Sequence, residues 1–273
     1  VPAIISAVKK EKRVVQKIIE KEGISGIISD NRFGVFSKNN PSVYITHQLQ
    51  VLSGLTTFLT SKTHQKFIKK FDECWVPDLD NKPRFSGFLS AKKNNSLNVK
   101  YIGILSRFNY KKITPKYNIL VLLSGVEPQR TILENKLLVE LKNYKGNVLF
   151  VRGVFNNTEI CVPNNFEIVD FLGKNELEEA INSSEMVISR SGYSTIMDLA
   201  VLGKKAFFIP TPGQYEQEYL AKMLADKLIA PFANQHEFTI AKLACLNRYS
   251  GFKIHKKKEA LNLFKLFEGK GKF

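Results

Sequence analysis

Between residues 118 and 228 the chain alternates between short apolar runs and longer amphipathic stretches. The apolar runs cover 118–125, 147–153, 166–171, 186–192 and 206–210. The amphipathic stretches between and after them cover 131–143, 176–184, 194–203 and 216–228. Apolar runs without polar alternation are typical of strands that are buried on both faces of a parallel sheet. Strands that alternate with helices therefore predict a doubly wound α/β domain.

The first hundred residues show a similar but shorter series. Residues 4–22 repeat apolar positions at helical spacing, and short apolar runs at 24–29, 43–46 and 73–77 predict strands, with a helix over 49–71. The stretch 86–104 is polar and rich in Asn, Lys and Gly, which indicates a domain boundary. We expect one domain over 1–100, a second over 101–250, and a basic amphipathic helix and tail over 251–273.

Composition narrows the kind of protein. Of 273 residues, 44% are hydrophobic, which is typical of a globular chain, and no apolar run approaches the roughly 20 residues of a membrane span. The three cysteines (Cys74, Cys161, Cys245) and four histidines are scattered, so we expect no disulfide framework, no metal site and a reducing cytoplasm.

The formal net charge of +16 favours an anionic partner. No nucleic-acid-binding signature occurs, so we expect no nucleic acid among the partners. A phosphorylated small molecule or an anionic membrane surface fits the charge. The alternative is a lysine-rich solvated surface without a specific partner.

Ligands of open α/β sheets bind outside the carboxyl ends of the strands, and three loops there are unusual. The first is LLSGVEPQR (122–130), in which Gly125 after Ser124 permits close backbone approach and Arg130 can pair with a phosphate. An ordinary strand-to-helix turn is the alternative.

The second loop is SRSGYST (189–195), which joins a buried strand to a helix. Exposed N–H groups behind Ser191 and Gly192, together with the positive end of the helix, can hold a diphosphate without a metal. Thr195 and Asp198 are three residues apart on one helix face, where Asp198 can accept hydrogen bonds from ribose hydroxyls. The alternative is a capping box that involves Thr195 and Asp198.

The third loop, PTPGQYEQE (210–218), sets a rigid turn before a helix. Amide and carboxylate side chains crowd the start of that helix, and they suit a ligand with many hydroxyls, such as a sugar: Gln214, Glu216, Gln217 and Glu218. Acidic side chains that complement the helix dipole are the alternative.

Together, the residues ISRSGYSTIMDLAVLGKKAFFIPTPGQYEQEYLAKML (188–224) resemble the carboxyl-terminal donor domain of GT-B glycosyltransferases. The likeness is closest to the family that contains the N-acetylglucosaminyltransferase of lipid II synthesis. It is specific over about 165–225 and weaker from 24 to 165. The resemblance implies an α/β fold of the GT-B type, with two Rossmann-like domains that have parallel sheets.

The resemblance also implies roles for the loop residues. Ser191 and Gly192 would hold the donor diphosphate with support from Thr195, and Asp198 would bind the ribose, where the family usually has glutamate. The donor sugar would face Gln214, Glu216 and Gln217. The backbone around Phe171 and Leu172 would contact the base, commonly uracil. Ser124, Gly125 and Arg130 would flank the phosphates, although SGVEPQR replaces the glycine-rich loop of the family.

GT-B enzymes present the acceptor and the catalytic base from their amino-terminal domain. That domain normally begins with a strand and a glycine-rich, often histidine-bearing loop, and no such segment precedes Val1, so we expect an incomplete domain here. Asp30 in GIISD and His47 in YITHQL both follow predicted strands. Each is a candidate for the base or its partner, or is simply a turn residue.

The expected activity is transfer of a sugar, of the N-acetylhexosamine type, from a UDP-sugar to an acceptor hydroxyl, with inversion and without a metal. A lipid-linked acceptor would place the protein in the cytoplasm, at the inner face of the membrane. The expected membrane contact is a tail that combines Lys256, Lys257 and Lys258 with Leu261, Phe264 and Phe267. The alternative is that the apolar face of this segment is buried against the amino-terminal domain, as is usual for the terminal helix of GT-B folds. The alternatives are a nucleotide-sugar hydrolase or epimerase, and a non-catalytic sugar-nucleotide-binding module.

Overall fold

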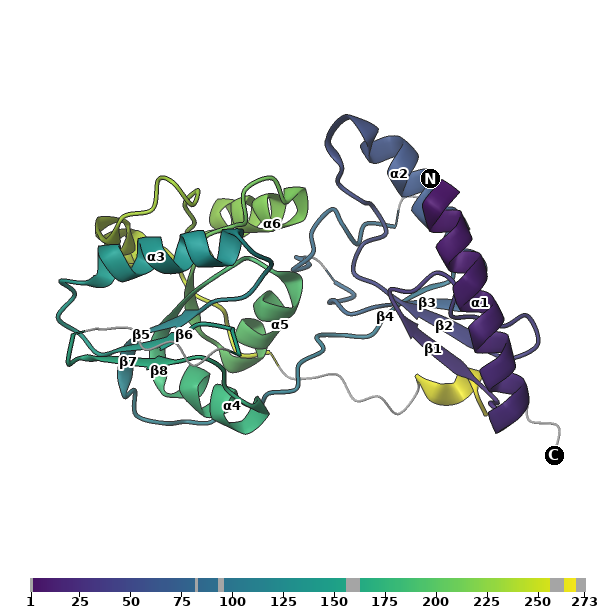
Figure 1. The fold of residues 1–273 in the computed structure, drawn as a ribbon, viewed down its shortest axis with the longest axis horizontal. Helices are drawn as coiled ribbons and strands as arrows, with labels where there is room; N and C mark the ends of the chain where they lie inside the picture. Colours follow the sequence, from purple (N-terminus) through teal and green to yellow (C-terminus); the bar gives the residue numbers. More distant parts are fainter. Residues whose placement is uncertain (1, 82, 93–95, 156–162, 256–262, 269–273) are drawn as a thin grey trace. The chain divides into compact units, whose positions relative to one another are not determined.

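The chain forms two compact units (Figure 1). The computed structural model describes residues 2–81, 83–92, 96–155, 163–255 and 263–268. The first unit consists of Val1–Ile104 together with Lys258–Phe273, and the second of Leu105–Lys257. The chain therefore passes from the first unit to the second and back again.

The first unit is built on a four-stranded parallel sheet with the order β1-β2-β3-β4. The strands are β1 (Ile27–Asp30), β2 (Ser42–Ile45), β3 (Glu73–Val76) and β4 (Val99–Tyr101). Helix α1 (Pro2–Glu22) precedes β1, and η1 (Gly54–Thr56) leads into α2 (Thr57–Ile68) between β2 and β3. Both predicted helices and three of the strands are confirmed. β4 was not predicted, because it is a three-residue strand within the polar stretch 86–104.

Two glycines of the first unit allow close packing. Gly34 lies against α1, where Glu11 accepts a hydrogen bond from its N–H at 2.8 Å, and a Cβ at this position would collide with Glu11. Gly26 lies under the ring of Phe267 in the same way. Apolar side chains of the carboxyl-terminal segment thus belong to the core of this unit.

That segment corrects the expectation of a separate amphipathic tail. Leu263, Leu266 and Phe267 pack against the buried cluster around Trp75, and Phe264 in the short η3 turn (Phe264–Leu266) meets the indole edge-on at 5.9 Å. The apolar side chains that were expected to reach a membrane therefore cover Trp75. Lys256, Lys257, Lys258 and Leu261 lie outside the described residues.

The second unit is a doubly wound sheet of five parallel strands with the order β7-β6-β5-β8-β9. Its elements run in the order β5 (Tyr117–Leu122), α3 (Gln129–Leu141), β6 (Val148–Val151), β7 (Phe166–Val169), α4 (Lys174–Asn182), β8 (Ser184–Ser189), α5 (Tyr193–Leu202), β9 (Lys205–Phe208), α6 (Tyr215–Asp226) and η2 (Ile240–Arg248). Figure 1 shows α3 and α6 on one face of the sheet and α4 and α5 on the other. Every strand and helix predicted for this half is present.

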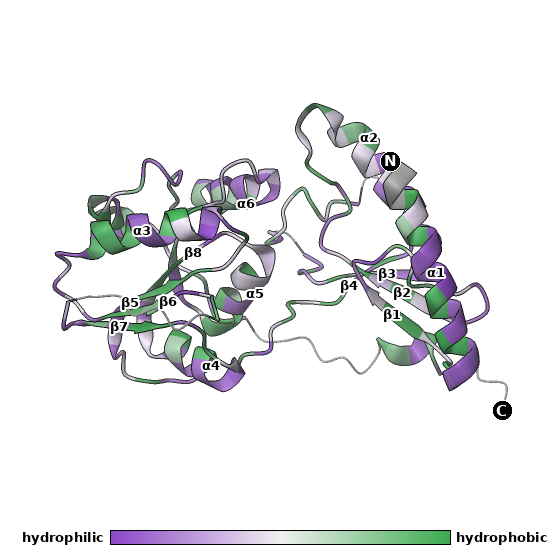
Figure 2. Ribbon diagram, viewed as in Figure 1, coloured by the Kyte–Doolittle hydropathy of each residue, from purple (hydrophilic) through white to green (hydrophobic). Residues whose placement is uncertain are grey.

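The uninterrupted apolar runs follow from burial on both faces. The strands of this unit are largely hydrophobic in Figure 2, and Val121, Phe150 and Ile188 are fully buried in its main cluster. All five strands are parallel, so their carboxyl ends meet at one edge of the sheet, and the loops that leave this edge can form a common site. In the described part of the chain, no helix has the length and apolarity that crossing a membrane requires.

Candidate functional site

The second unit has a topological switch point between β5 and β8. From β5 the chain proceeds outward through β6 and β7, and then returns to the other side of β5 with β8 and β9. Leu122 pairs in register with Ser189, so the turn at Ser124 and Gly125 and the turn at Ser191 and Gly192 leave adjacent strands at the same edge. A crevice at such a point is where open α/β sheets bind ligands.

Helix α5 begins at this point without a side-chain cap. Its N-cap residue is Gly192, with φ −67° and ψ 142°, and it makes no side-chain cap hydrogen bond. A capping box needs an N-cap side chain, which glycine lacks. The first N–H groups of a helix have no partners within the helix and carry the positive end of its dipole, so they can bind a phosphate group.

Gly192 is required by neither backbone conformation nor packing. Its φ is negative, and a Cβ at this position would meet only Thr195 Oγ1, at 3.9 Å. A side chain at this position would therefore not strain the turn. What the glycine provides is open space in front of the helix end.

Ser191 has a different role from the one expected. Its side chain is fully buried, and its hydroxyl donates a hydrogen bond to the carbonyl of Gln217 at 2.8 Å. The hydroxyl thus ties the start of α5 to the first turn of α6 instead of facing a ligand. Ser194, which sequence reasoning did not select, is the exposed hydroxyl of this turn.

Asp198 lies on the same face of α5 as Thr195, and both are half-buried. The hydroxyl of Ser106 donates to Asp198 Oδ1 at 2.6 Å and so orients the carboxylate. Ser106 and Asp198 line a hollow of about 570 Å³ together with Leu105, Arg107 and Ser194. Asp198 therefore presents an oriented acceptor to a cavity beside the helix end. Ser106 was missed because it lies 92 residues away in the sequence.

The predicted pairing of Arg130 with a phosphate is wrong. Arg130 is buried, and its guanidinium donates to Glu127 at 2.6 Å, to Glu134 at 2.7 Å and to Thr131 at 2.6 Å. Glu134 also pairs with Arg152, which reaches Asp170 at 2.6 Å. Arg130 thus belongs to an ion-pair chain that links the start of α3 to the ends of β6 and β7.

The turn after β5 itself remains open. Ser124 and Gly125 are both exposed, and Gly125 has a φ of +114°, which favours glycine. No atom lies within 4 Å of a Cβ built on Gly125. Backbone groups of this turn are therefore accessible next to the start of α5.

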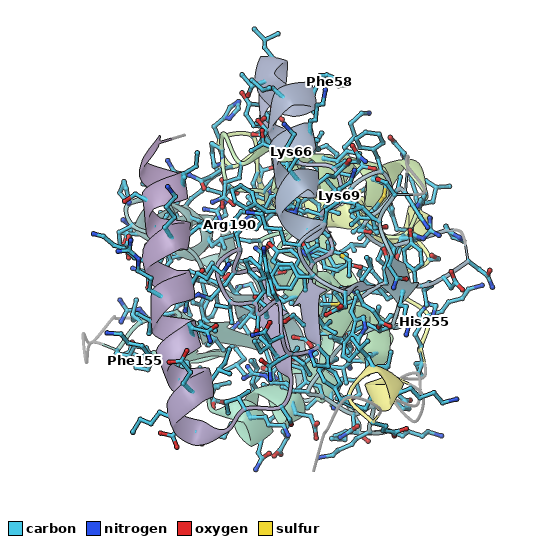
Figure 3. The ribbon with its side chains drawn as sticks, turned by 90° about the vertical axis from the view of Figure 1, so that its right-hand side faces the viewer. Phe58, Lys66, Lys69, Phe155, Arg190 and His255 are labelled. Atoms are coloured by element: carbon cyan, nitrogen blue, oxygen red, sulfur yellow. The ribbon has the colours of Figure 1, made fainter. Side chains whose placement is uncertain are left out.

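Exposed aromatic rings follow β6 and β7. Phe171 is 54% exposed and Phe155, labelled in Figure 3, is 86% exposed, with ring centroids 4.7 Å apart. Leu172 is half-buried beside them. Exposed rings of this size at a ligand-binding edge offer a flat apolar surface to a planar base. The sequence analysis selected Phe171 but not Phe155. Phe155 was missed because a segment without a clear hydrophobic pattern separates it from Phe171 in the sequence.

The polar cluster at the start of α6 is ordered by hydrogen bonds. Gln217 accepts from the N–H of Thr211 at 2.9 Å and donates to Gln214 Oε1 at 2.7 Å. Gln214 is exposed, whereas Glu216 and Gln217 are half-buried. The three predicted side chains therefore form one polar surface after β9.

In the first unit, Asp30 and His47 lie at the carboxyl edge of adjacent strands. Asp30 ends β1 in register with Ile45, and His47 follows two residues later. Asp30 is exposed and His47 is half-buried. His64 on α2, which sequence reasoning did not select, packs edge-on against Phe33 at 5.1 Å, and burial lowers its pKa to about 4. His64 is therefore neutral at physiological pH.

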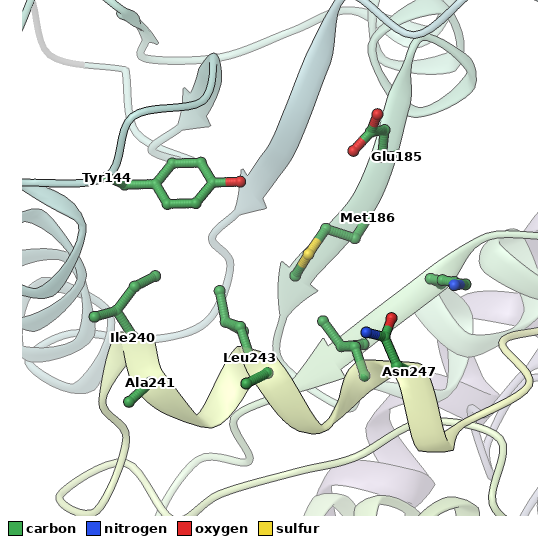
Figure 4. Close-up of a pocket in the computed structure, with 10 residues that line it drawn as sticks. Tyr144, Glu185, Met186, Ile240, Ala241, Leu243 and Asn247 are labelled. Carbon is green, nitrogen blue, oxygen red and sulfur yellow. The ribbon is translucent and has the colours of Figure 1, made fainter.

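A separate hollow of about 590 Å³ lies between η2 and the sheet (Figure 4). Tyr144, Met186, Lys205 and Leu243 are among its lining residues. Met186 and Lys205 lie at the amino-terminal ends of β8 and β9, so this hollow opens at the edge opposite the two glycine turns. Among the residues that the structure describes, no group of three or more His, Cys, Asp or Glu side chains could hold a metal ion.

The fold of the chain is that of the GT-B glycosyltransferases. It resembles MurG of Acinetobacter baumannii, with a TM-score of 0.57 at 15% identity, over 90% of this chain and 71% of that one. A Listeria monocytogenes protein described as a UDP-N-acetylglucosamine 2-epimerase gives a TM-score of 0.64 at 9% identity, over 97% and 78%. The fold alone therefore does not separate transferases from epimerases.

Sequence similarity makes that distinction. Residues 126–260 match the glycosyltransferase family 28 C-terminal domain. A relative from Histophilus somni, a UDP-N-acetylglucosamine–N-acetylmuramyl-(pentapeptide) pyrophosphoryl-undecaprenol N-acetylglucosamine transferase, is 26% identical over 255 residues. The alignment covers 89% of this chain and 68% of that relative. This chain is therefore similar to glycosyltransferases in sequence as well as in fold.

Proposed function

We propose that this protein transfers an N-acetylhexosamine-type sugar from a UDP-sugar to an acceptor hydroxyl. The observation that carries the proposal is the uncapped start of α5 at the switch point of the second unit, with open space in front of Gly192. A diphosphate fits this arrangement because helix-end N–H groups bind anions. The choice of sugar is supported by the name of the Histophilus somni relative.

The remaining parts of the donor then have places along the same sheet edge. The uracil would lie against Phe155 and the backbone of Phe171 and Leu172, and the ribose hydroxyls would bond to Asp198. The sugar would face the surface formed by Gln214, Glu216 and Gln217. Ser124 and Gly125 would border the diphosphate from the adjacent strand. The base and the sugar would then lie towards opposite ends of this edge, after β7 and β9, with the diphosphate between them.

The proposed chemistry is a single displacement with inversion. The acceptor oxygen attacks the anomeric carbon as the bond from that carbon to the diphosphate oxygen breaks. A base in the first unit, Asp30 or His47, takes the acceptor proton. The helix-end N–H groups stabilise the charge that develops on the leaving diphosphate, and this needs no metal ion.

We further propose that the acceptor is lipid-linked and that α2 carries the membrane contact. Leu55, Phe58 and Leu59 are 107%, 80% and 66% exposed. Leu55 lies in η1, directly before the helix. On α2 itself, Phe58 is followed by the exposed Lys62 and Lys66 at four-residue steps, so apolar and basic side chains share one face of the helix. Figure 3 labels Phe58 and Lys66 along α2. Such a face suits an anionic bilayer surface, where each lysine contributes about 1 kcal/mol.

The test is to incubate the full-length protein with UDP-N-acetylglucosamine in the presence and absence of a lipid-linked acceptor. Release of UDP that depends on the acceptor supports the proposal. Release of UDP without an acceptor would indicate a hydrolase. Conversion of the sugar of the donor into its epimer would indicate an epimerase, and binding of UDP without turnover would indicate a non-catalytic module. The match of residues 126–260 to the glycosyltransferase family 28 C-terminal domain does not favour these three alternatives.

A further inference from the structure

Arg190 is a buried cation at the carboxyl end of β8, directly before Ser191. Only 2% of its surface is exposed (Figure 3). Nη1 donates to the carbonyls of Ile209 and Pro210 at 3.0 and 3.1 Å, and Nη2 to the carbonyl of Gln129 at 2.8 Å and to Gln235 Oε1 at 2.6 Å. Within the described part of the chain, its Nε, which is also buried, has no hydrogen-bond partner.

Arg190 differs from the two buried arginines nearby in the charge of its hydrogen-bond partners. Arg130 and Arg152 each bond to carboxylates. The hydrogen-bond partners of Arg190 are neutral oxygens, which bond to Nη1 and Nη2 but leave the charge of the guanidinium uncompensated. Burial lowers the pKa of Arg190 to about 10, so the guanidinium remains charged at neutral pH. A buried charge without an ion partner is costly and is commonly retained for function.

The hydrogen-bond partners place the guanidinium at the same edge of the sheet as the candidate site. They belong to the start of α3, the end of β9 and the segment around residue 235, and all of these elements meet at the edge with the two glycine turns. Gln235 is held in place because its amide donates to Gln129 Oε1 at 3.1 Å. The network therefore fixes the position of the guanidinium without neutralising its charge. Arg190 itself lies two residues before Gly192 in the chain.

We propose that the counter-ion of Arg190 is the diphosphate of the donor, bound at the start of α5. The inference rests on the proposed function, because it requires an anion at that position. Arg190 acts as a positioning and electrostatic residue from beneath the turn and does not touch the reacting atoms. The interaction acts through the protein interior, where charges are screened less than in water. The site therefore selects ligands by negative charge, which a neutral nucleoside lacks.

The test compares Arg190→Gln, which removes the charge, with Arg190→Lys, which keeps it. The probes are UDP and uridine, measured by isothermal titration calorimetry. We expect Arg190→Gln to weaken UDP binding at least tenfold and to change uridine binding less than twofold, and Arg190→Lys to stay within about threefold of the wild type for both. The matched control is Lys204→Gln. The Lys204 ammonium also bonds to carbonyls, those of Asn182 and Ser184, but at the opposite edge of the sheet, so we expect UDP binding to remain unchanged.

Three results would overturn the inference. Arg190→Gln could bind UDP like the wild type, it could lose UDP and uridine to the same extent, or the Lys204→Gln control could weaken UDP as strongly. If Arg190→Gln does not fold, the Nε–H resonance of Arg190 in the wild type decides the question: a shift with UDP but not with uridine supports the inference, and no shift overturns it. A wild type that does not bind UDP at all would instead refute the proposed function itself.

Discussion

Replacement of Gly192 by valine separates phosphate binding from folding. The backbone at Gly192 has a conformation that valine adopts readily, and the added Cβ would meet only Thr195 Oγ1, at 3.9 Å. Valine is a poorer N-cap than glycine, which costs roughly 1 kcal/mol of stability or less. We therefore expect Gly192→Val to fold with a small decrease in the free energy of unfolding.

The same side chain would occupy the space in front of the α5 N–H groups. A hydrogen bond to a charged group contributes about 1.5–3 kcal/mol. Displacement of the diphosphate from one or two such bonds would cost about 2–4 kcal/mol, which corresponds to a roughly 30- to 1,000-fold increase in Kd. Gly192→Ala should lie between the wild type and Gly192→Val.

Isothermal titration with UDP and uridine measures the effect, and thermal unfolding monitors the fold. Uridine should bind Gly192→Val and the wild type alike, because it has no phosphate. Ala241→Val is the matched control, since it adds a similar bulk to the hollow at the opposite edge of the sheet. If folded Gly192→Val binds UDP with wild-type affinity, the start of α5 is not the phosphate site.

Four further predictions concern other parts of the chain. The pKa of His64 is about 4 in the folded protein and about 6.5 in the unfolded chain, so the free energy of unfolding should fall by up to about 3 kcal/mol as the pH drops from 6.5 to 4. In urea unfolding, the free energy of unfolding should depend less on pH in His64→Asn than in the wild type, whereas the exposed His236→Asn should behave like the wild type. The same pH dependence in both variants would contradict this. Asp198→Asn should weaken UDP binding about tenfold and abolish the preference for UDP over 2′-deoxy-UDP, whereas a retained preference would remove Asp198 from the ribose site. EDTA should leave transfer unchanged, and activity that requires added Mg²⁺ or Mn²⁺ would contradict metal-independent leaving-group stabilisation. Phe58→Ser should reduce salt-sensitive co-sedimentation with anionic vesicles, and unchanged binding would show that α2 is not the contact.

The sequence predicts the fold well because its strongest signals are local. A doubly wound sheet produces strand-sized apolar runs, and each of them was found. Val99–Tyr101 escaped because this strand is short and half-buried, which leaves no clear apolar run. The two glycine turns were found for the same reason, since strand, turn and helix follow one another along the chain.

Side-chain partners in the site were predicted less well, because they come together only on folding. The bond between Ser106 and Asp198 spans 92 residues, and that between Arg190 and Gln235 spans 45. The sequence could not distinguish Arg130, whose charge is neutralised by nearby glutamates, from Arg190, whose charge is not. That distinction depends on which carboxylates the fold brings within reach.

The packing of Phe267 and its neighbours on Trp75 has a consequence for protein synthesis. Leu263, Leu266 and Phe267 are translated after the entire second unit, yet they complete a core that begins with the strands of the first. On the ribosome, the second unit can fold while Trp75 still lacks this cover. Nascent chains stalled before residue 263 would thus lack this cover of the indole, and a truncation before that residue would damage the first unit although it leaves residues 1–104 intact.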